Sequence, residues 1–263
     1  MITRSLPGGM GNRGAVLRVG DTVRRPVAMQ AASISPLLQH LADAGFLAPV
    51  LVGSDDEGRQ VFRWIEGEVP VSPYPSWSIK DDVLTSVGAL LRRYHTAVCE
   101  FRPPPRAGWS NELADPQGGS LVCHNDVCPE NVVFRDGHAV GLLDFDFAAP
   151  GRPVWDLAQV ARMWIPLRPP DMPDERAALN RFERLALLAM AYGLDPGESA
   201  ALVDAIIESK RIGSAYVRRR VSYGESAFME AWEAQGGQAG DDRAIAWLEA
   251  NREHFVRSLS RDL

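Results

Sequence analysis

Long apolar runs are absent from this chain of 263 residues. None approaches the roughly 20 apolar residues that a membrane-spanning helix needs, and no charged-then-apolar leader opens the sequence. Cysteine is scarce as well. The chain has three cysteines, Cys99, Cys123 and Cys128. Their number is odd and their spacing is not that of a metal site, so we expect reduced thiols that fill space. These absences predict a cytoplasmic protein with no membrane partner.

Basic side chains are outnumbered in this sequence. The chain holds 28 Lys and Arg against 34 Asp and Glu, and its only lysines are Lys80 and Lys210. No basic stripe is present, so a nucleic-acid partner is not expected. Residues 68–156 are the more acidic part, which suits Mg²⁺ and a cationic substrate, although ordinary solvated charge explains the second point equally well. The length allows one large domain or two small lobes.

What the sequence does contain is a dense group of polar residues near its middle. An apolar run ends in His124-Asn125-Asp126, and a second run follows Asn131. Asp136-Gly137 separates the second run from a third, which ends in Asp144-Phe145-Asp146. Asp-Gly between two β-type runs predicts a hairpin with a two-residue type I′ turn. In that register Asn131 lies opposite Leu142, so that Asp126, Asn131 and Asp144 converge at one end of the hairpin.

This convergence of side chains suits phosphoryl transfer. Mg²⁺ takes hard oxygen ligands and shares itself with substrate phosphates, so Asn131 and Asp144 are candidate metal ligands. Asp146 is a further ligand or a substrate contact. Asp126 is then free to position a hydroxyl group and to accept its proton, which is the work that phosphoryl transfer asks of a protein side chain.

The pattern His124-x-Asp126-x-x-x-x-Asn131, followed by Asp144-Phe145-Asp146, resembles the catalytic loop and metal-binding turn of the protein-kinase-like superfamily. Within that superfamily the chain resembles the aminoglycoside phosphotransferase and choline kinase branch, because Asp156-Leu157-Ala158 follows shortly. The resemblance implies that Asp156 is a structural carboxylate bonded to the backbone of the catalytic loop. It also implies that His124 orients this catalytic loop, while Asp126 is the base.

The resemblance further implies an α+β, bilobal fold. Its N-lobe would span residues 1–67, with a five-stranded antiparallel sheet and one helix that bind the nucleotide. Its C-lobe would span residues 68–263 and hold the catalytic hairpin and a mainly helical, acceptor-binding region. The nucleotide base is expected at the hinge between these lobes, near the backbone of Trp64 and Glu66.

Phosphate binding is assigned to the first residues of the chain. Gly9-x-Gly11-x-x-Gly14-x-Val16 matches the kinase glycine-rich loop, whose backbone N–H groups cover phosphates. The superfamily carries a basic residue, usually Lys, on a following strand; here Arg24 is the first candidate and Arg25 the second. Relatives commonly pair this residue with a helix glutamate, yet no acidic residue lies between Arg25 and Asp43. The orientation of the phosphate-binding arginine is therefore left open.

Apolar periodicity predicts a mainly helical remainder. The expected helices span residues 35–44, 81–99, 154–164, 174–192, 196–220, 225–233 and 241–259. In this family the C-terminal helices build the acceptor pocket. Glu225, Asp241 and Asp242 are candidate partners of ammonium groups on the acceptor, with helix capping or solvated surface charge as the alternative.

Taken together, these features predict an enzyme that moves the γ-phosphoryl group of ATP or GTP, with Mg²⁺, to a hydroxyl of a small molecule. Aminoglycosides, other antibiotics, choline-like amines, homoserine and sugars are all candidate acceptors. The short span from Asp144 to Asp156 leaves no room for the peptide-docking segment of protein kinases, which disfavours a protein acceptor. Two alternatives stay open: a non-catalytic binding or immunity protein on the same fold, and an enzyme that transfers a nucleotidyl group. The oligomeric state is not predicted.

Overall fold

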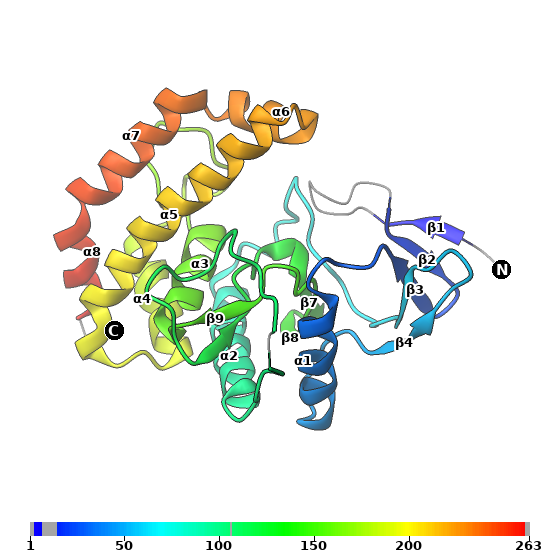
Figure 1. Ribbon diagram of the computed structural model, residues 1–263. Coiled ribbons are helices and arrows are strands. Elements are labelled where there is room, and N and C mark those ends of the chain that lie inside the picture. Colours follow the sequence, from blue (N-terminus) through cyan, green and yellow to red (C-terminus); the bar gives the residue numbers. More distant parts are fainter. Residues whose placement is uncertain (1–2, 7–14, 106, 261–263) are drawn as a thin grey trace.

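The computed structural model describes residues 3–6, 15–105 and 107–260. An antiparallel sheet of five strands, in the order β1-β2-β3-β5-β4, forms one end of the molecule (Figure 1). The strands are β1 (Thr3–Ser5), β2 (Leu17–Val19), β3 (Thr22–Arg25), β4 (Leu51–Ser54) and β5 (Gln60–Arg63). The helix α1 (Ala31–Asp43) lies between this sheet and the rest of the chain (Figure 1).

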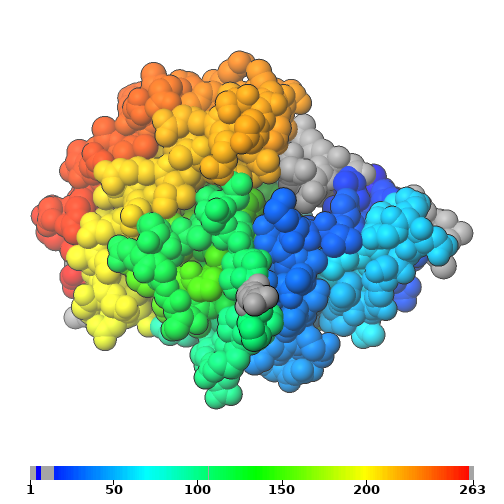
Figure 2. All heavy atoms as spheres, in the orientation of Figure 1, coloured from blue at the N-terminus to red at the C-terminus, as the bar shows by residue number. Residues whose placement is uncertain are grey.

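The remainder is mainly helical, as the sequence predicts. Its helices are α2 (Asp81–Val98), α3 (Pro153–Trp164), α4 (Arg181–Tyr192), α5 (Ser199–Ser222), α6 (Ser226–Ala234), α7 (Gly237–Ala250) and α8 (Arg252–Leu259), with short 3-10 turns at Pro129–Asn131 and Pro196–Glu198. One apolar core runs from Leu37 and Leu41 of α1 into Leu84 and Leu91 of α2 and onward to α3, α4 and α5. Figure 2 shows the same continuity on the surface, where blue atoms of the N-terminal part lie directly against green ones.

Two short antiparallel pairs carry the central motif between α2 and α3. They are β6 (Leu121–Cys123) with β9 (Ala149–Gly151), and β7 (Val132–Arg135) with β8 (His138–Leu142). Asp136 and Gly137 have φ angles of 50° and 76°. Positive φ at both central residues defines a type I′ turn, so the turn predicted from Asp-Gly is confirmed.

The far end of this hairpin departs from the predicted register. Arg135 pairs with His138 next to the turn, but a bulge shifts the ladder so that Val132, not Asn131, lies opposite Leu142. The predicted pairing of Asn131 with Leu142 across the hairpin was therefore wrong by one residue, because the bulge adds an extra residue to β8. Asn131 instead ends the 3-10 turn, and its carbonyl accepts a hydrogen bond from the Leu143 N–H at 2.8 Å.

The linker that follows β5 crosses directly against the hairpin. The Glu68 N–H donates to the Phe134 carbonyl at 2.9 Å, and the Phe134 N–H donates back to the Glu68 carbonyl at 2.8 Å. Gly67 approaches the hairpin so closely, with φ of 147°, that a Cβ there would lie 2.4 Å from Cγ1 of Val133. Glycine is required at this position by both its φ angle and the lack of space.

Three predicted helices differ from the observed ones. The first, expected from residue 35, begins at Ala31, and Pro36 lies inside it while Ile34, Leu37 and Leu38 are buried. The helix expected from residue 174 begins only at Arg181, because the Asn180 side chain caps it by accepting from the N–H groups of Phe182 and Glu183. The helix expected over 241–259 is two helices that part at Asn251, whose side chain donates to the Trp247 carbonyl at 2.8 Å.

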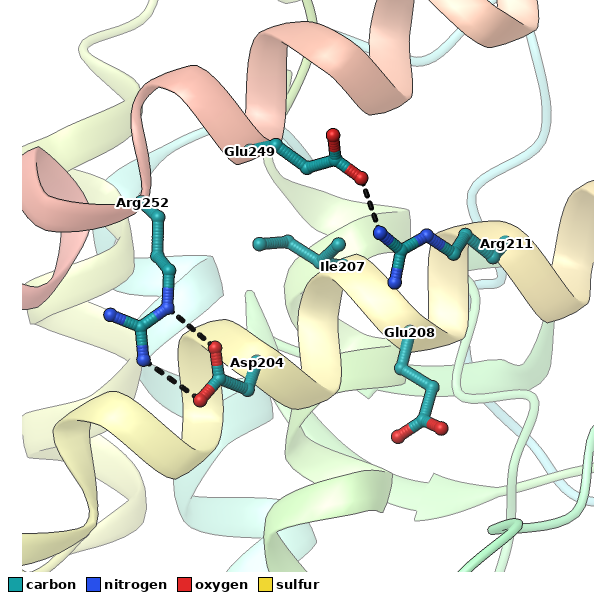
Figure 3. Close-up of a pocket in the computed structure, with 6 residues that line it drawn as sticks. All are labelled: Asp204, Ile207, Glu208, Arg211, Glu249 and Arg252. Carbon is teal, nitrogen blue, oxygen red and sulfur yellow. Dashed lines mark hydrogen bonds and ion pairs between the residues drawn. The ribbon is translucent and has the colours of Figure 1, made fainter.

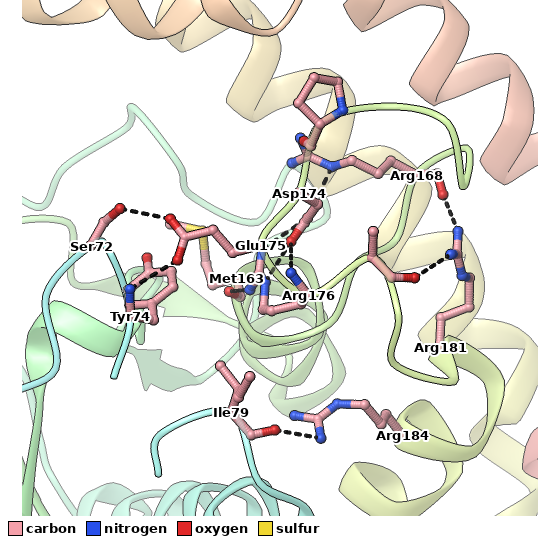
Figure 4. A network of polar contacts seen from close by, with 12 residues as sticks. Ser72, Tyr74, Ile79, Met163, Arg168, Asp174, Glu175, Arg176, Arg181 and Arg184 are labelled. Carbon is pink, nitrogen blue, oxygen red and sulfur yellow. Dashed lines mark hydrogen bonds and ion pairs between the residues drawn. The ribbon is translucent and has the colours of Figure 1, made fainter. Parts of the chain in front are cut away.

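Arginine side chains hold the segment between α3 and α4, where a helix was expected to begin (Figure 4). Arg176 donates to the Met163 carbonyl, Arg181 to the Arg168 carbonyl, and Arg184 to the Ile79 carbonyl at 3.0 Å. The carboxylate of Glu175 accepts from the Ser72 hydroxyl at 3.0 Å, which joins this segment to the loop before α2. Side chains thus tie this segment and the start of α4 to the end of α3 and to the loop before α2. No helix in the described part of the chain is long and apolar enough to cross a bilayer.

Candidate active site

The catalytic loop brings Asp126 and Asn131 into direct contact. The Asn131 side-chain nitrogen donates to both the carboxylate and the backbone carbonyl of Asp126, each at 2.9 Å. The amide orientation assigned by this network leaves the Asn131 Oδ1 without a donor among the described residues. Burial and the neighbouring charge of Asp144 raise the pKa of Asp126 to about 7, against the opposing effects of Arg162 and Asn131. A carboxylate with such a pKa can hold or release a proton near neutral pH.

Asp156, at the start of α3, binds the backbone of the same loop. Its carboxylate is fully buried and accepts hydrogen bonds from the backbone N–H groups of His124 and Asn125, both at 2.8 Å. Burial alone would raise the pKa of Asp156, but a hydrogen bond from His95 and these amide donors lower it. Asn125 has a φ of 66°, a left-handed conformation that the two bonds to Asp156 help to hold.

His124 connects the catalytic loop to the strand before Asp144. Its Nε2 donates to the Leu143 carbonyl at 2.9 Å, and its Nδ1 accepts from the Asp126 N–H at 3.3 Å. This pattern requires a neutral ring with the proton on Nε2. Complete burial lowers the pKa of His124, which agrees with that neutral form. Both ring nitrogens of His124 are thus engaged by backbone groups, one of Leu143 and one of Asp126.

Asp144 and Asp146 form a carboxylate pair that Arg25 bridges. Arg25 Nη1 lies 3.1 Å from the Asp144 carboxylate, and its Nη2 binds the Asp146 carboxylate. Burial and the charge of Asp144 raise the pKa of Asp146, and Arg25 acts in the opposite direction. Asp144 has a φ of 57°, an uncommon conformation for a non-glycine residue. The pair therefore concentrates negative charge that attracts a cation.

These donors fit Mg²⁺. Asn131 and Asp144 offer the hard oxygen ligands that this ion takes, and the free Asn131 oxygen and the partly exposed Asp144 carboxylate remain accessible. One or two carboxylates usually suffice, because Mg²⁺ keeps water and phosphate oxygens as its other ligands.

The structure separates the two arginines that the sequence offered as phosphate ligands. Successive residues of a strand point to opposite faces, so Arg24 and Arg25 of β3 diverge. Arg24 pairs with Asp55 at 3.4 Å, whereas Arg25 reaches the site. Although burial opposes it, the charges of Asp144 and Asp146 raise the pKa of Arg25. The first-ranked candidate, Arg24, is thus not brought to the site and the second-ranked one is. Asp144 and Asp146 thus pair with Arg25 in place of the helix glutamate that this chain lacks.

Other predicted positions lie further out. Gly9, Gly11 and Gly14 fall outside the described residues. Trp64 Nε1 donates to the Glu66 carboxylate at 2.6 Å, and the Arg18 guanidinium lies 3.8 Å from the Trp64 ring centre. Trp64 and Glu66 therefore contact each other in the segment that follows β5.

The three carboxylates proposed for an ammonium group do not form an acidic cluster. Glu225 pairs with Arg220 at 3.0 Å, Asp241 pairs with Lys210, and Asp242 accepts from Gln238 at 2.7 Å. A groove of about 390 Å³ between α5 and the helices α7 and α8 is lined by other charged residues (Figure 3). Two of its three carboxylates are also engaged, since Asp204 binds Arg252 at 2.6 Å and Glu249 binds Arg211. This groove lies apart from the catalytic loop and carries no part of its chemistry.

Sequence reasoning missed two contributors. His95 is a buried residue of α2 whose Nε2 lies 3.1 Å from the Asp156 carboxylate and whose Nδ1 lies 2.8 Å from the Tyr192 hydroxyl. The charge of Arg162, which lies on α3, acts to lower the pKa of Asp126. Neither residue has a local sequence signal, because each meets its partner through packing between helices.

The fold and this site together define a class, the protein-kinase-like proteins. The structure resembles that of the aminoglycoside phosphotransferase APH(2″)-IIIa in complex with GDP and kanamycin, with a TM-score of 0.58 and 15% identity over 96% of this chain and 93% of that one. It also resembles a choline/ethanolamine kinase family protein from Mesorhizobium loti, with a TM-score of 0.54 and 17% identity over 89% of each chain. The predicted α+β kinase-like fold is confirmed.

Sequence comparison identifies the family within this class. Residues 106–190 match the phosphotransferase enzyme family. The chain is also 34% identical over 265 aligned positions to the trifolitoxin immunity protein of Rhizobium leguminosarum bv. trifolii, covering 95% of this chain and 97% of that protein. The chain belongs to the phosphotransferase enzyme family, as the pattern of its catalytic loop predicts.

Proposed function

We propose that this protein transfers the γ-phosphoryl group of ATP or GTP to a hydroxyl group of a small molecule. The observation that carries the proposal is the hydrogen-bonded pair of Asp126 and Asn131 beside the Asp144–Asp146 carboxylates. Positioning and charge neutralisation are what phosphoryl transfer requires, and these residues are suited to both.

Each residue has a distinct role in this proposal. Asp126 positions the acceptor hydroxyl and takes its proton, while Asn131 fixes the Asp126 carboxylate through the hydrogen bond at 2.9 Å. Asn131 and Asp144 would hold Mg²⁺, which would supply neutralising charge to the nucleotide phosphates. Arg25 leaves the carboxylates to bind phosphate oxygens, which suit its planar fork of donors. Asp156 and His124 keep the loop in shape.

The acceptor is proposed to be a small molecule of the antibiotic or toxin kind. The name of the curated relative denotes immunity to a toxin, and the similar aminoglycoside phosphotransferase was crystallised with kanamycin. Chemical modification of a toxic compound is one way for a phosphotransferase to confer immunity.

The test is mass spectrometry of the products. The purified chain is incubated with Mg-ATP or Mg-GTP and a panel of hydroxylated antibiotics, peptides, amines, acids and sugars, and an added phosphate is sought. Asp126→Asn is expected to lower transfer by at least a hundredfold while nucleotide still binds, because general base catalysis typically contributes that much. Asp204→Asn, an equal charge change at an exposed ion pair, is the matched control. Equal rates for the wild type and Asp126→Asn would remove Asp126 from the reaction.

A second candidate is a non-catalytic immunity protein that binds its target on the kinase fold. The missing helix glutamate and the immunity relative favour it. Nucleotide binding without turnover across the panel, together with tight binding of a panel compound, would support this candidate. Transfer of a nucleotidyl group, the remaining alternative, gives a product whose added mass is that of a nucleoside monophosphate unit.

A further inference from the structure

A half-buried cation, Arg162 of α3, lies near the catalytic loop with no carboxylate partner among the described residues. Its Nε and Nη2 both donate to Oε1 of Gln159, at 3.2 and 2.9 Å. Burial lowers the pKa of Arg162, and the charge of Asp126 acts in the opposite direction. A neutral amide oxygen is a weak partner for a guanidinium, so the charge of Arg162 is left for another group.

The opposite helix makes room for this guanidinium. A Cβ at Gly213, in the middle of α5, would lie 3.2 Å from Arg162 Nη1 and 3.3 Å from its Cζ. Glycine is among the poorest residues inside a helix. Its presence there is explained by the close approach of Arg162, which indicates that the chain is shaped around this cation.

Two further buried donors, one on each of these helices, have no partner among the described residues. Gln159 lies one turn before Arg162 on α3, and its Nε2 is fully buried without an acceptor among the residues that the structure describes. Ser214 follows Gly213 on α5, and its buried hydroxyl is likewise without a partner there. Buried donors in native proteins are nearly always paired, so this set calls for oxygen atoms that accept hydrogen bonds.

Two further cations lie near Arg162, and each of them is paired with one carboxylate. Lys210 shares the α5 face with Gly213 and Ser214, being three and four residues away. Its ion pair with Asp241 is the nearby compensation, and one oxygen of that carboxylate has no donor. Arg168 adds a further positive charge that is felt at both Arg162 and Lys210, and it pairs with Asp174 at 3.3 Å. Arg162 thus differs from these two cations, because it has no carboxylate partner among the described residues.

We propose that Arg162, Gln159 and Ser214 form an anion subsite between α3 and α5, which binds a carboxylate or phosphate group of the acceptor whose hydroxyl is presented to Asp126. The proposal rests on the proposed phosphotransferase function and defines its substrate class. Guanidinium, amide and hydroxyl donors match the oxygens of an anion, and the positive charge of Arg162 repels an ammonium group. The acceptor is thus an anionic hydroxyl compound rather than a polyamine.

The first test measures anion binding directly. Inorganic phosphate and acetate are titrated calorimetrically into the full chain saturated with Mg²⁺ and a non-hydrolysable ATP analogue, so that the nucleotide site is occupied. At least one of the two anions is expected to bind in the millimolar range, and the stronger one identifies the group as phosphate-like or carboxylate-like. Absence of binding by both anions would overturn the proposal.

Variants at two positions locate the anion. Arg162→Gln is expected to weaken binding at least tenfold, and Arg162→Lys less, because it keeps the charge. Gly213→Ala displaces the guanidinium by a few tenths of an ångström with a residue that favours helix, so its melting temperature should equal or exceed that of the wild type while anion affinity falls. Arg211→Gln, next to Lys210 but paired with Glu249 on the outer face (Figure 3), is the charge-matched control with unchanged binding. Equal affinity in the wild type, Arg162→Gln and Gly213→Ala would refute the subsite.

A transfer assay separates this inference from the proposed function. Each hydroxylated acid in the acceptor panel is tested beside its uncharged amide and a matching amine. Phosphorylation of acids, with a KM raised by Arg162→Gln, supports the subsite; phosphorylation of the amines alone overturns it and leaves the phosphotransferase intact. Anion binding with no nucleotide bound or consumed would instead contradict the proposed function and retain the subsite.

Discussion

Asp156 is the residue whose replacement tests most directly how the catalytic loop is held. Asp156→Asn keeps the shape of the side chain, but its amide can accept from only one of the two N–H groups, of His124 and Asn125, that now lie 2.8 Å from the carboxylate. The amide nitrogen then faces the other N–H, donor against donor. Because the side chain is fully buried, water cannot readily replace the lost bond.

The magnitude follows from these contacts. A hydrogen bond to a charged acceptor contributes about 1.5–3 kcal/mol, and a buried N–H left without a partner costs about 1–3 kcal/mol. Asp156→Asn should therefore lower the free energy of unfolding by about 3–5 kcal/mol, which corresponds to a fall in Tm on the order of 10 °C for a domain of this size. The exposed pair of Asp204 with Arg252 provides the control, since Asp204→Asn should cost about 1 kcal/mol or less.

The pH dependence of the free energy of unfolding is a second test of the same hydrogen bonds. The pKa of Asp156 is below the ordinary value of 3.8 in the folded protein, so its stabilising effect is present above that value and is lost as the pH falls through the folded pKa. Urea unfolding of the wild type and Asp156→Asn, followed by circular dichroism, should show the full difference at pH 7 and a shrinking one only below about pH 4. A difference under 1 kcal/mol at pH 7 would refute the role assigned to this carboxylate.

Two further predictions concern the site and the linker. Arg25→Gln removes the cation that bridges Asp144 and Asp146. Mn²⁺ should therefore bind the nucleotide-free variant about tenfold more tightly than the wild type, as followed by electron paramagnetic resonance. Unchanged affinity would show that Arg25 does not compete for these carboxylates. Gly67→Ala places a Cβ 2.4 Å from Val133 Cγ1 at a φ of 147°, so it should lower the free energy of unfolding by about 2 kcal/mol or more, whereas Gly108→Ala, with open space around its Cβ, should change it little in the same urea titration.

Local sequence signals were sufficient where the physical cause is local. Asp136-Gly137 specified its own turn, because few other residue pairs adopt two positive φ angles, and the apolar periodicity of residues 81–98 specified α2. The spacing of His124, Asp126, Asn131 and Asp144 predicted both the fold class and the family. Local signals failed for helix boundaries that depend on distant partners. One such boundary is the start of α4, where the segment before the Asn180 cap is held by Glu175 bound to Ser72 and by Arg176 bound to the Met163 carbonyl.

The choice between Arg24 and Arg25 marks the limit of the sequence. Two adjacent arginines on a strand are chemically identical, and only the pairing of β3 with its neighbours decides that Arg25 meets Asp144 while Arg24 meets Asp55. The same holds for the contact of His95 with Asp156 and for that of Arg162 with Gly213. In each case the two residues lie far apart in the chain and meet through helix packing. The sequence by itself determined which chemical groups are present and how the catalytic loop is ordered. Tertiary structure decided which cation faces which carboxylate, because that depends on the faces that strands and helices turn toward one another.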